Sequence, residues 1–123
     1  VEQDYYERTG IFPIMHLLVI RRDVYDKYPW VAADLLEAFT EAKDRSLSRL
    51  SDPTAPHFPL PWGVDRARVA EKIFGRDLWP YGVEPNRTTI EAFLTYSYEQ
   101  GLTDRLLAVE ELFPPNVTER YVI

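Results

Sequence analysis

The segment from Ile11 to Ile20 is apolar at nearly every position, and it constrains the fold of this chain more than any other feature. In an extended strand, alternate side chains lie on opposite faces, and here both faces are apolar. This pattern is typical of a strand buried on both sides, so we expect a strand over about residues 9–22. Its one histidine, His16, would then lie in a dry environment.

Most of the remaining chain has helical periodicity. We expect four helices, over residues 29–50, 65–74, 88–101 and 104–113. Pro29 suits the first position of the long helix, because its missing N–H costs nothing there. Asp65 is placed to cap the second helix and Gly75 to end it. The pattern Thr88-Thr-Ile-Glu91 is a capping box for the third helix, which Gly101 would end.

Three other segments are less regular. We expect residues 1–8 to form a lead-in segment or short helix, and Asp23–Tyr28 to form a turn or a single helical turn. Ser51–Gly63 contains four prolines and several aromatic residues, so we expect a packed cover rather than a helix or a central strand. The tail Glu119–Ile123 offers at best a second strand. The sequence therefore predicts a helix-rich α+β fold with about four helices and one or two strands.

The chain has one domain's worth of residues but lacks partners for its predicted buried strand. At 123 residues it can bury a single core. A doubly buried strand needs neighbours on both edges, so we expect the missing strands upstream or in a partner chain. The sequence begins at Val1 and its only methionine is Met15, which indicates processing or a fragment. We expect residues 1–123 to be one fragment of a larger protein, with upstream lobes absent.

Composition excludes several function classes. A formal charge of −6 argues against nucleic acid or an anionic membrane as partner, and no apolar run is long enough to span a bilayer. There are no cysteines, and the two histidines have no metal-ligand spacing, so we expect no protein-built metal site. There is also no glycine-rich phosphate loop, and we expect no cofactor.

Two groups of residues could support chemistry. His16 precedes Arg21 and Arg22; imidazole suits proton transfer near neutral pH, but the residues alone favour a core histidine that donates to a backbone carbonyl, with the arginines at a solvated strand end. The turn from Trp79 to Arg87 combines aromatic rings, a carboxylate, an amide and a guanidinium ahead of a helix. It could bind a planar anion, or it could be a packed turn in which Asn86 or Thr88 caps the helix.

Several motifs together resemble the C-terminal third of the 4,5-dihydroxyphthalate decarboxylase family. They cover nearly the whole chain in order, apart from the proline-rich loop. They are Thr9-Gly-Ile-Phe-Pro-Ile-Met-His16, Arg21-Arg22-Asp23-Val-Tyr25, Pro29-Trp30, Trp79-Pro-Tyr-Gly-Val-Glu-Pro-Asn-Arg87, Glu91-Ala-Phe-Leu94, Tyr98-Glu-Gln-Gly101 and Glu110-Glu-Leu-Phe113. The resemblance implies a two-lobed α/β fold similar to type II periplasmic solute-binding proteins. Residues 9–22 would then cross the hinge between lobes, and the helical remainder, residues 29–113, would complete one lobe.

The same resemblance implies loss of CO₂ from 4,5-dihydroxyphthalate to give 3,4-dihydroxybenzoate, in the cytoplasm and by a possible homo-oligomer. His16 would be the catalytic acid or would orient a catechol hydroxyl. The remaining substrate-binding residues would be Thr9, Phe12, Arg22, Trp79, Tyr81 and Arg87. Arg87 or Arg22 would hold a carboxylate, and Trp79 or Tyr81 would lie along the ring. The alternative is a solute-binding protein for a small aromatic or organic anion, and the isolated fragment is expected to be inactive.

Overall fold

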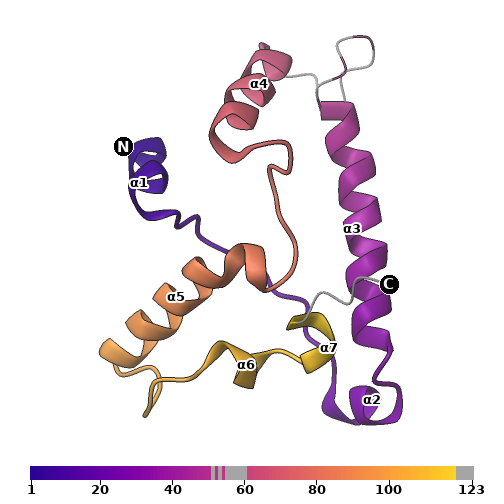
Figure 1. Ribbon diagram of the computed structural model, residues 1–123, viewed down its shortest axis with the longest axis vertical. Coiled ribbons are helices and arrows are strands. Elements are labelled where there is room, and N and C mark those ends of the chain that lie inside the picture. Colours follow the sequence, from indigo (N-terminus) through magenta and orange to yellow (C-terminus); the bar gives the residue numbers. More distant parts are fainter. Residues whose placement is uncertain (51, 53, 55–60, 119–123) are drawn as a thin grey trace. The chain divides into compact units, whose positions relative to one another are not determined.

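A computed structural model describes residues 1–50, 52, 54 and 61–118. The chain divides into two units. Unit 1 comprises Val1–Leu36 and Tyr81–Ile123, and unit 2 is the continuous stretch Glu37–Pro80. The described elements, labelled in Figure 1, are α1 (Glu2–Thr9), α2 (Arg22–Lys27), α3 (Val31–Leu50), α4 (Gly63–Phe74), the 3₁₀ helix η1 (Glu84–Asn86), α5 (Arg87–Glu99), α6 (Val109–Leu112) and α7 (Pro115–Thr118). The helix-rich character predicted from the sequence is confirmed.

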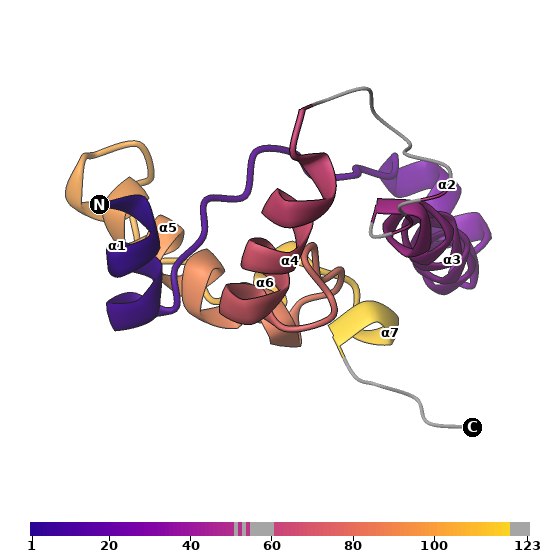
Figure 2. The same cartoon turned by 90° about the horizontal axis from the view of Figure 1, so that it is seen from above.

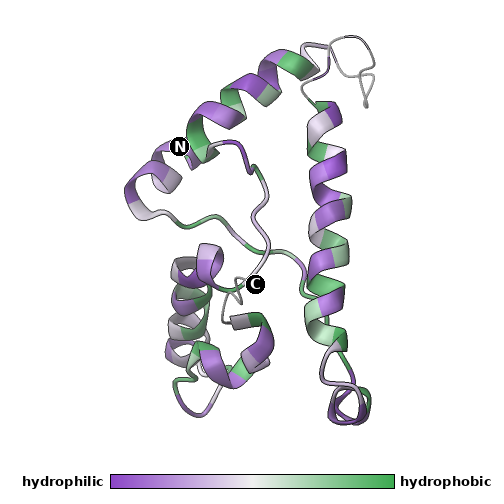
Figure 3. Cartoon of the chain, turned by 45° about the vertical axis from the view of Figure 1, so that its right-hand side comes forward, coloured by the Kyte–Doolittle hydropathy of each residue, from purple (hydrophilic) through white to green (hydrophobic). Residues whose placement is uncertain are grey.

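The long amphipathic helix predicted over residues 29–50 is confirmed as α3. It begins two residues later than expected, because Pro29 and Trp30 form a turn in which the Val31 N–H donates to the Tyr28 carbonyl at 3.0 Å. Figure 3 shows hydrophobic and hydrophilic residues alternating along this helix, as expected for one that is only partly covered. The possible single helical turn before it is the six-residue helix α2.

The third predicted helix is present as α5, but the predicted capping box is wrong. The helix begins at Arg87, directly after η1, so Thr88 lies inside its first turn rather than at its N-cap. Asn86 occupies the N-cap, yet its side-chain amide donates to the Gly82 carbonyl at 2.9 Å instead of accepting from the helix. Gly101 follows the C-cap with a φ of 72°, which confirms it as the left-handed residue that ends the helix.

The other helix boundaries differ from expectation by a few residues. α4 begins at Gly63, which places Asp65 in the first turn rather than at the cap, and Gly75 ends it with a φ of 84°. α6 has only four residues, so the helix predicted over residues 104–113 is wrong in its first half. α6 ends at Leu112, ahead of Pro114 and Pro115, and Pro115 begins the next helix, α7, where the missing N–H of proline costs nothing.

The strand predicted over residues 9–22 is wrong. Residues 10–21 connect α1 to α2 without regular structure (Figure 1 and Figure 2), and no strand occurs among the described residues. The apolar side chains are exposed rather than buried: Met15 is 73% exposed and Val19 is 85% exposed. A strand requires a neighbour to satisfy its backbone N–H and C=O groups, and the described residues supply none here. The tail Glu119–Ile123 and most of the proline-rich cover lie outside the described residues.

Unit 1 has a small apolar core around α5. Val83, Ile90, Leu94 and Val109 are buried together, with Leu107 and Phe113 packed against them. Polar contacts join distant parts of the same unit: the Phe12 N–H donates to Thr89 Oγ1 at 3.3 Å, and the Asn116 amide donates to the Pro29 carbonyl at 2.8 Å. Among the described residues, this apolar cluster and these side-chain hydrogen bonds therefore help to hold the first unit together.

None of the described helices is both long enough and apolar enough to cross a membrane.

Candidate functional site

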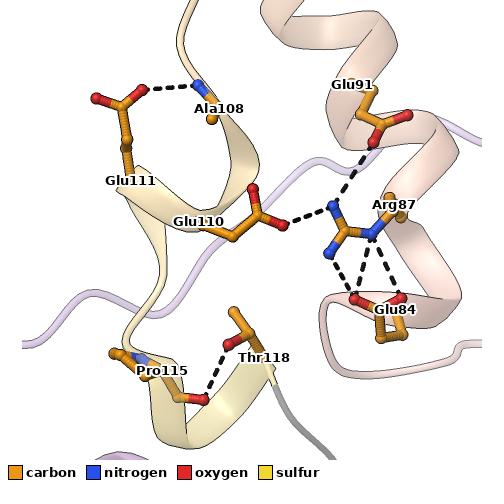
Figure 4. A network of polar contacts seen from close by, with 8 residues as sticks. All are labelled: Glu84, Arg87, Glu91, Ala108, Glu110, Glu111, Pro115 and Thr118. Carbon is orange, nitrogen blue, oxygen red and sulfur yellow. Dashed lines mark hydrogen bonds and ion pairs between the residues drawn. The ribbon is translucent and has the colours of Figure 1, made fainter.

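Arg87, at the first position of α5, is the centre of a charge network in unit 1. Its Nη2 lies 2.6 Å from Glu84 Oε1, and its Nη1 lies 2.9 Å from Glu110 Oε1 and 3.6 Å from Glu91 Oε1 (Figure 4). Helical spacing explains two of these contacts, because Glu84 precedes Arg87 by three residues and Glu91 follows by four. The third carboxylate comes from α6, so the network joins η1, α5 and α6.

The positive charge of Arg87 and the negative charges of its glutamate partners stabilise one another. The hydrogen bond from Arg87 lowers the pKa of Glu84 below its ordinary value. The pKa of Glu110 is lowered first by its own backbone N–H and then by Arg87. The hydrogen bonds to Glu84 and Glu110 in turn raise the pKa of Arg87. All three guanidinium nitrogens face carboxylates, so a substrate carboxylate would have to exchange with one of them.

A second ion pair organises the short helix α6. Arg105 donates to both carboxylate oxygens of Glu111, at 3.0 and 2.6 Å, and the Ala108 N–H donates to the same carboxylate at 2.8 Å. Ala108 is the N-cap of α6, so Glu111 satisfies one backbone N–H at the helix start. Arg105 and this backbone hydrogen bond lower the pKa of Glu111 to about 2.

Thr9 and Phe12, two predicted substrate-binding residues, lie where α1 ends. Thr9 Oγ1 donates to the Tyr5 carbonyl at 2.8 Å and accepts from the Ile11 N–H at 3.1 Å. The Phe12 ring packs edge-to-face on Tyr6, with 6.4 Å between ring centroids. Through its hydrogen bond to Thr89, the Phe12 backbone meets the first turn of α5. The structure therefore brings Phe12 to the same helix turn as Arg87.

His16 and Arg22 are not joined to that turn. His16 lies in the irregular segment 10–21 with its side chain exposed, and so the expectation of a buried histidine is wrong. Arg22 is the first residue of α2 and is also exposed. Within the described residues, no hydrogen bond or ion pair links either side chain to Arg87. Arg21, just before Arg22, is paired with Asp23, and this hydrogen bond raises the pKa of Arg21.

The two predicted aromatic residues, Trp79 and Tyr81, fall on either side of the boundary between units. Tyr81 is the first residue of the second part of unit 1, whereas Trp79 lies in the loop that ends unit 2. The Trp79 N–H donates to Asp77 Oδ1 at 3.2 Å. Asp77 Oδ2 in turn lies 2.6 Å from the ammonium of Lys43 in α3. Both aromatic side chains are half-exposed: Trp79 by 49% and Tyr81 by 40%.

Sequence reasoning missed the partners that hold these side chains. Glu84 and Glu91 could have been assigned to Arg87 from helical spacing alone. Lys43 and Asp77 gave no comparable signal, because they are 34 residues apart and neither belongs to a motif. Among the described residues, no group of three or more histidine, aspartate or glutamate side chains is arranged to hold a metal ion.

Comparison with known proteins identifies a relative by sequence similarity. No protein-family model matches it. The chain is similar to a decarboxylase, with 38% identity over 120 residues. That relative is 4,5-dihydroxyphthalate decarboxylase of Comamonas testosteroni, and the match includes 98% of this chain but only 36% of the relative. The resemblance inferred from the motifs is confirmed, and the chain spans about a third of the length of the protein that it matches.

Proposed function

We propose that this chain is the C-terminal part of a decarboxylase that releases CO₂ from an aromatic dicarboxylate, converting 4,5-dihydroxyphthalate to 3,4-dihydroxybenzoate. One observation carries the proposal: the similarity to a decarboxylase extends over 98% of the chain rather than over a single motif. The activity belongs to the complete protein. We expect residues 1–123 alone to release no CO₂, because the match covers only 36% of the relative and most of that protein has no counterpart in this chain.

The reaction sets clear requirements for the site. Each carboxylate of this substrate is para to a hydroxyl group, which donates electron density to the ring carbon that loses CO₂. That carbon takes up a proton, and the electron pair of the breaking C–C bond restores the aromatic ring as CO₂ leaves. The site must therefore supply a general acid over the ring face, a cation for the retained carboxylate and a poorly solvating region for the departing one.

In this proposal His16 supplies the proton or orients a catechol hydroxyl. Arg22 or Arg87 holds the retained carboxylate, and Trp79 or Tyr81 lies along the ring. Thr9 and Phe12 contact the substrate near the start of α5. Arg87 supports this role because its guanidinium already binds carboxylates, and a substrate carboxylate can replace Glu91, the most distant of the three at 3.6 Å.

The proposal extends to the fold and location. The complete protein would have two α/β lobes, as in type II periplasmic solute-binding proteins, and residues 10–21 would be the segment that crosses between them. The exposed apolar side chains on this segment support a covered position in the complete protein. We place the enzyme in the cytoplasm; an export signal in the complete reading frame would contradict this location and favour a receptor for aromatic anions.

The test is CO₂ release from 4,5-dihydroxyphthalate by the complete protein, measured with and without a chelator. Turnover supports the proposal, and insensitivity to the chelator would show that the missing part supplies no essential metal. Binding without turnover, measured by calorimetry, would overturn the enzyme proposal in favour of a solute-binding protein.

His16→Asn in the complete protein tests the acid. Loss of a positioned general acid should lower kcat by at least about 100-fold, while circular dichroism and the melting temperature stay unchanged. The matched control is His57→Asn, at the only other histidine of the chain, which should retain most of the activity. Normal turnover by His16→Asn would remove this residue from the mechanism.

A further inference from the structure

Lys43 is a charged side chain in the interior of unit 2. Its side chain is only 7% exposed, and its ammonium lies 2.6 Å from Asp77 Oδ2 and 3.3 Å from Asp44 Oδ1. Burial lowers the pKa of Lys43, but the hydrogen bonds that its ammonium donates to Asp77 and Asp44 outweigh this effect and leave the pKa above its ordinary value. Lysine is rarely buried unless it is paired with a carboxylate. The buried ammonium of Lys43 therefore fixes the position of the Asp77 carboxylate.

Asp77 connects this buried ammonium to the backbone of Trp79. One carboxylate oxygen binds Lys43, and the other accepts the Trp79 N–H at 3.2 Å. The intervening loop follows Gly75, which ends α4 with a φ of 84°, and residues 75–80 have no helix or strand of their own. The contacts of the Asp77 side chain with Lys43 and with the Trp79 backbone therefore help to order this loop.

We propose that Lys43 is a positioning residue for the aromatic ring of Trp79 and acts through the carboxylate of Asp77. Lys43 lies on α3, a twenty-residue helix, so the loop takes its position from a rigid element. The role of Trp79 against a substrate ring rests on the proposed function, whereas the link from Lys43 to Trp79 rests only on contacts within unit 2. The two can therefore be tested separately.

Steady-state kinetics of the complete protein test the functional part. Lys43→Met keeps the length of the side chain but removes the charge, and it should raise KM for 4,5-dihydroxyphthalate at least fivefold with less than a twofold change in kcat. If Lys43 acts through Trp79, the same substitution in a Trp79→Phe background should change KM less than twofold. The matched control is Asp44→Asn, which removes the exposed second carboxylate and should leave KM within twofold of the original.

A spectroscopic measurement tests the link without any activity. In protein labelled with 5-fluorotryptophan, the Trp79 fluorine signal is assigned by its loss in Trp79→Phe. Lys43→Met should shift and broaden this signal, while Asp44→Asn should leave it in place. Asp77→Asn, at a half-exposed position, should act in the same direction as Lys43→Met and replaces it if that variant fails to fold.

The outcomes separate the two proposals. If the original protein shows no turnover, the proposed function fails, and the fluorine signal alone decides whether Lys43 positions Trp79. If the Trp79 signal is unchanged in both Lys43→Met and Asp77→Asn, the link is wrong. Additive effects of Lys43→Met and Trp79→Phe on KM would also overturn it, because the two residues would then act independently.

Discussion

The guanidinium of Arg87 is shared by carboxylates from η1, α5 and α6, so one side chain connects three elements that bury few apolar residues. Glu111 connects nearby parts of the chain, because its carboxylate binds Arg105 and also accepts the Ala108 N–H at the start of α6. These exposed pairs gain little from charge alone in water. Their importance is geometric, since they hold short elements that have weak helix-forming tendency by themselves.

Glu111 should give α6 a distinct dependence on pH. Its folded-state pKa of about 2 is below its ordinary value of 4.5, so the stabilisation is complete above pH 4.5 and is lost as the pH falls toward 2. We expect the Ala108 amide to exchange faster with solvent across this range, and Glu111→Gln to remove most of that pH dependence. Amide exchange followed by NMR measures both. A Glu111 carboxyl that titrates near 4.5 would contradict this expectation, and Glu99→Gln provides the exposed control.

At the scale of single elements, α5 contributes two of the four buried residues of the apolar cluster in its unit, Ile90 and Leu94. Leu94 is 4% exposed and packs in the cluster with Val83, Ile90 and Val109. Leu94→Ala removes three buried carbons and leaves a cavity, which should cost about 2–5 kcal/mol in the free energy of unfolding. Amide exchange of α5 in the complete protein measures this cost. Thr95→Ala, one residue along on the exposed face, should change it by less than about 0.5 kcal/mol.

The helices were predictable where local signals agree. Amphipathic spacing located α3, and Gly75 and Gly101 ended α4 and α5 as expected, because only glycine adopts positive φ without strain. The errors arise where two signals compete. Thr88-Thr-Ile-Glu91 has the sequence of a capping box, but η1 already winds the chain before Arg87, so the helix starts one residue earlier.

The sequence indicated some of the contacts made by the candidate residues, whereas their roles in a site stay predictions. The sequence correctly grouped Glu84 and Arg87 in one turn, and it chose Phe12, whose backbone meets that turn through Thr89. It could not show that three carboxylates contact the Arg87 guanidinium, because Glu110 lies on α6 and reaches Arg87 only in the folded chain. The prediction that His16 is buried was wrong for a related reason. Apolar periodicity indicates which side chains a segment can bury, but not whether another element is present to cover them.

At the scale of the whole molecule, the apolar segment 10–21 has consequences for association. Leu17 is 63% exposed, and its neighbours on both faces are also apolar and exposed. We expect an isolated chain of residues 1–123 to self-associate as its concentration rises, since uncovered apolar segments pair with one another. Sedimentation velocity should show this behaviour, and Leu17→Lys with Val19→Lys should reduce it.

The same two substitutions also test where the segment lies in the complete protein. If residues 10–21 are covered there, the pair should destabilise the complete protein while making the isolated chain more soluble. Lysine substitutions at Glu37 and Glu41, exposed positions of α3, are the matched control and should do neither. A monomeric isolated chain at all concentrations would contradict the prediction of self-association.

The division of the chain also determines the order in which its parts can be completed during synthesis. Unit 2 is one uninterrupted stretch, whereas unit 1 is assembled from two stretches that lie on either side of it in sequence. The hydrogen bonds that join those two stretches connect residues 77, 87 and 91 positions apart. A ribosome therefore releases all of residues 37–80 before the partners of the N-terminal segment exist. The first residues to be made in this chain are among the last to reach their final contacts.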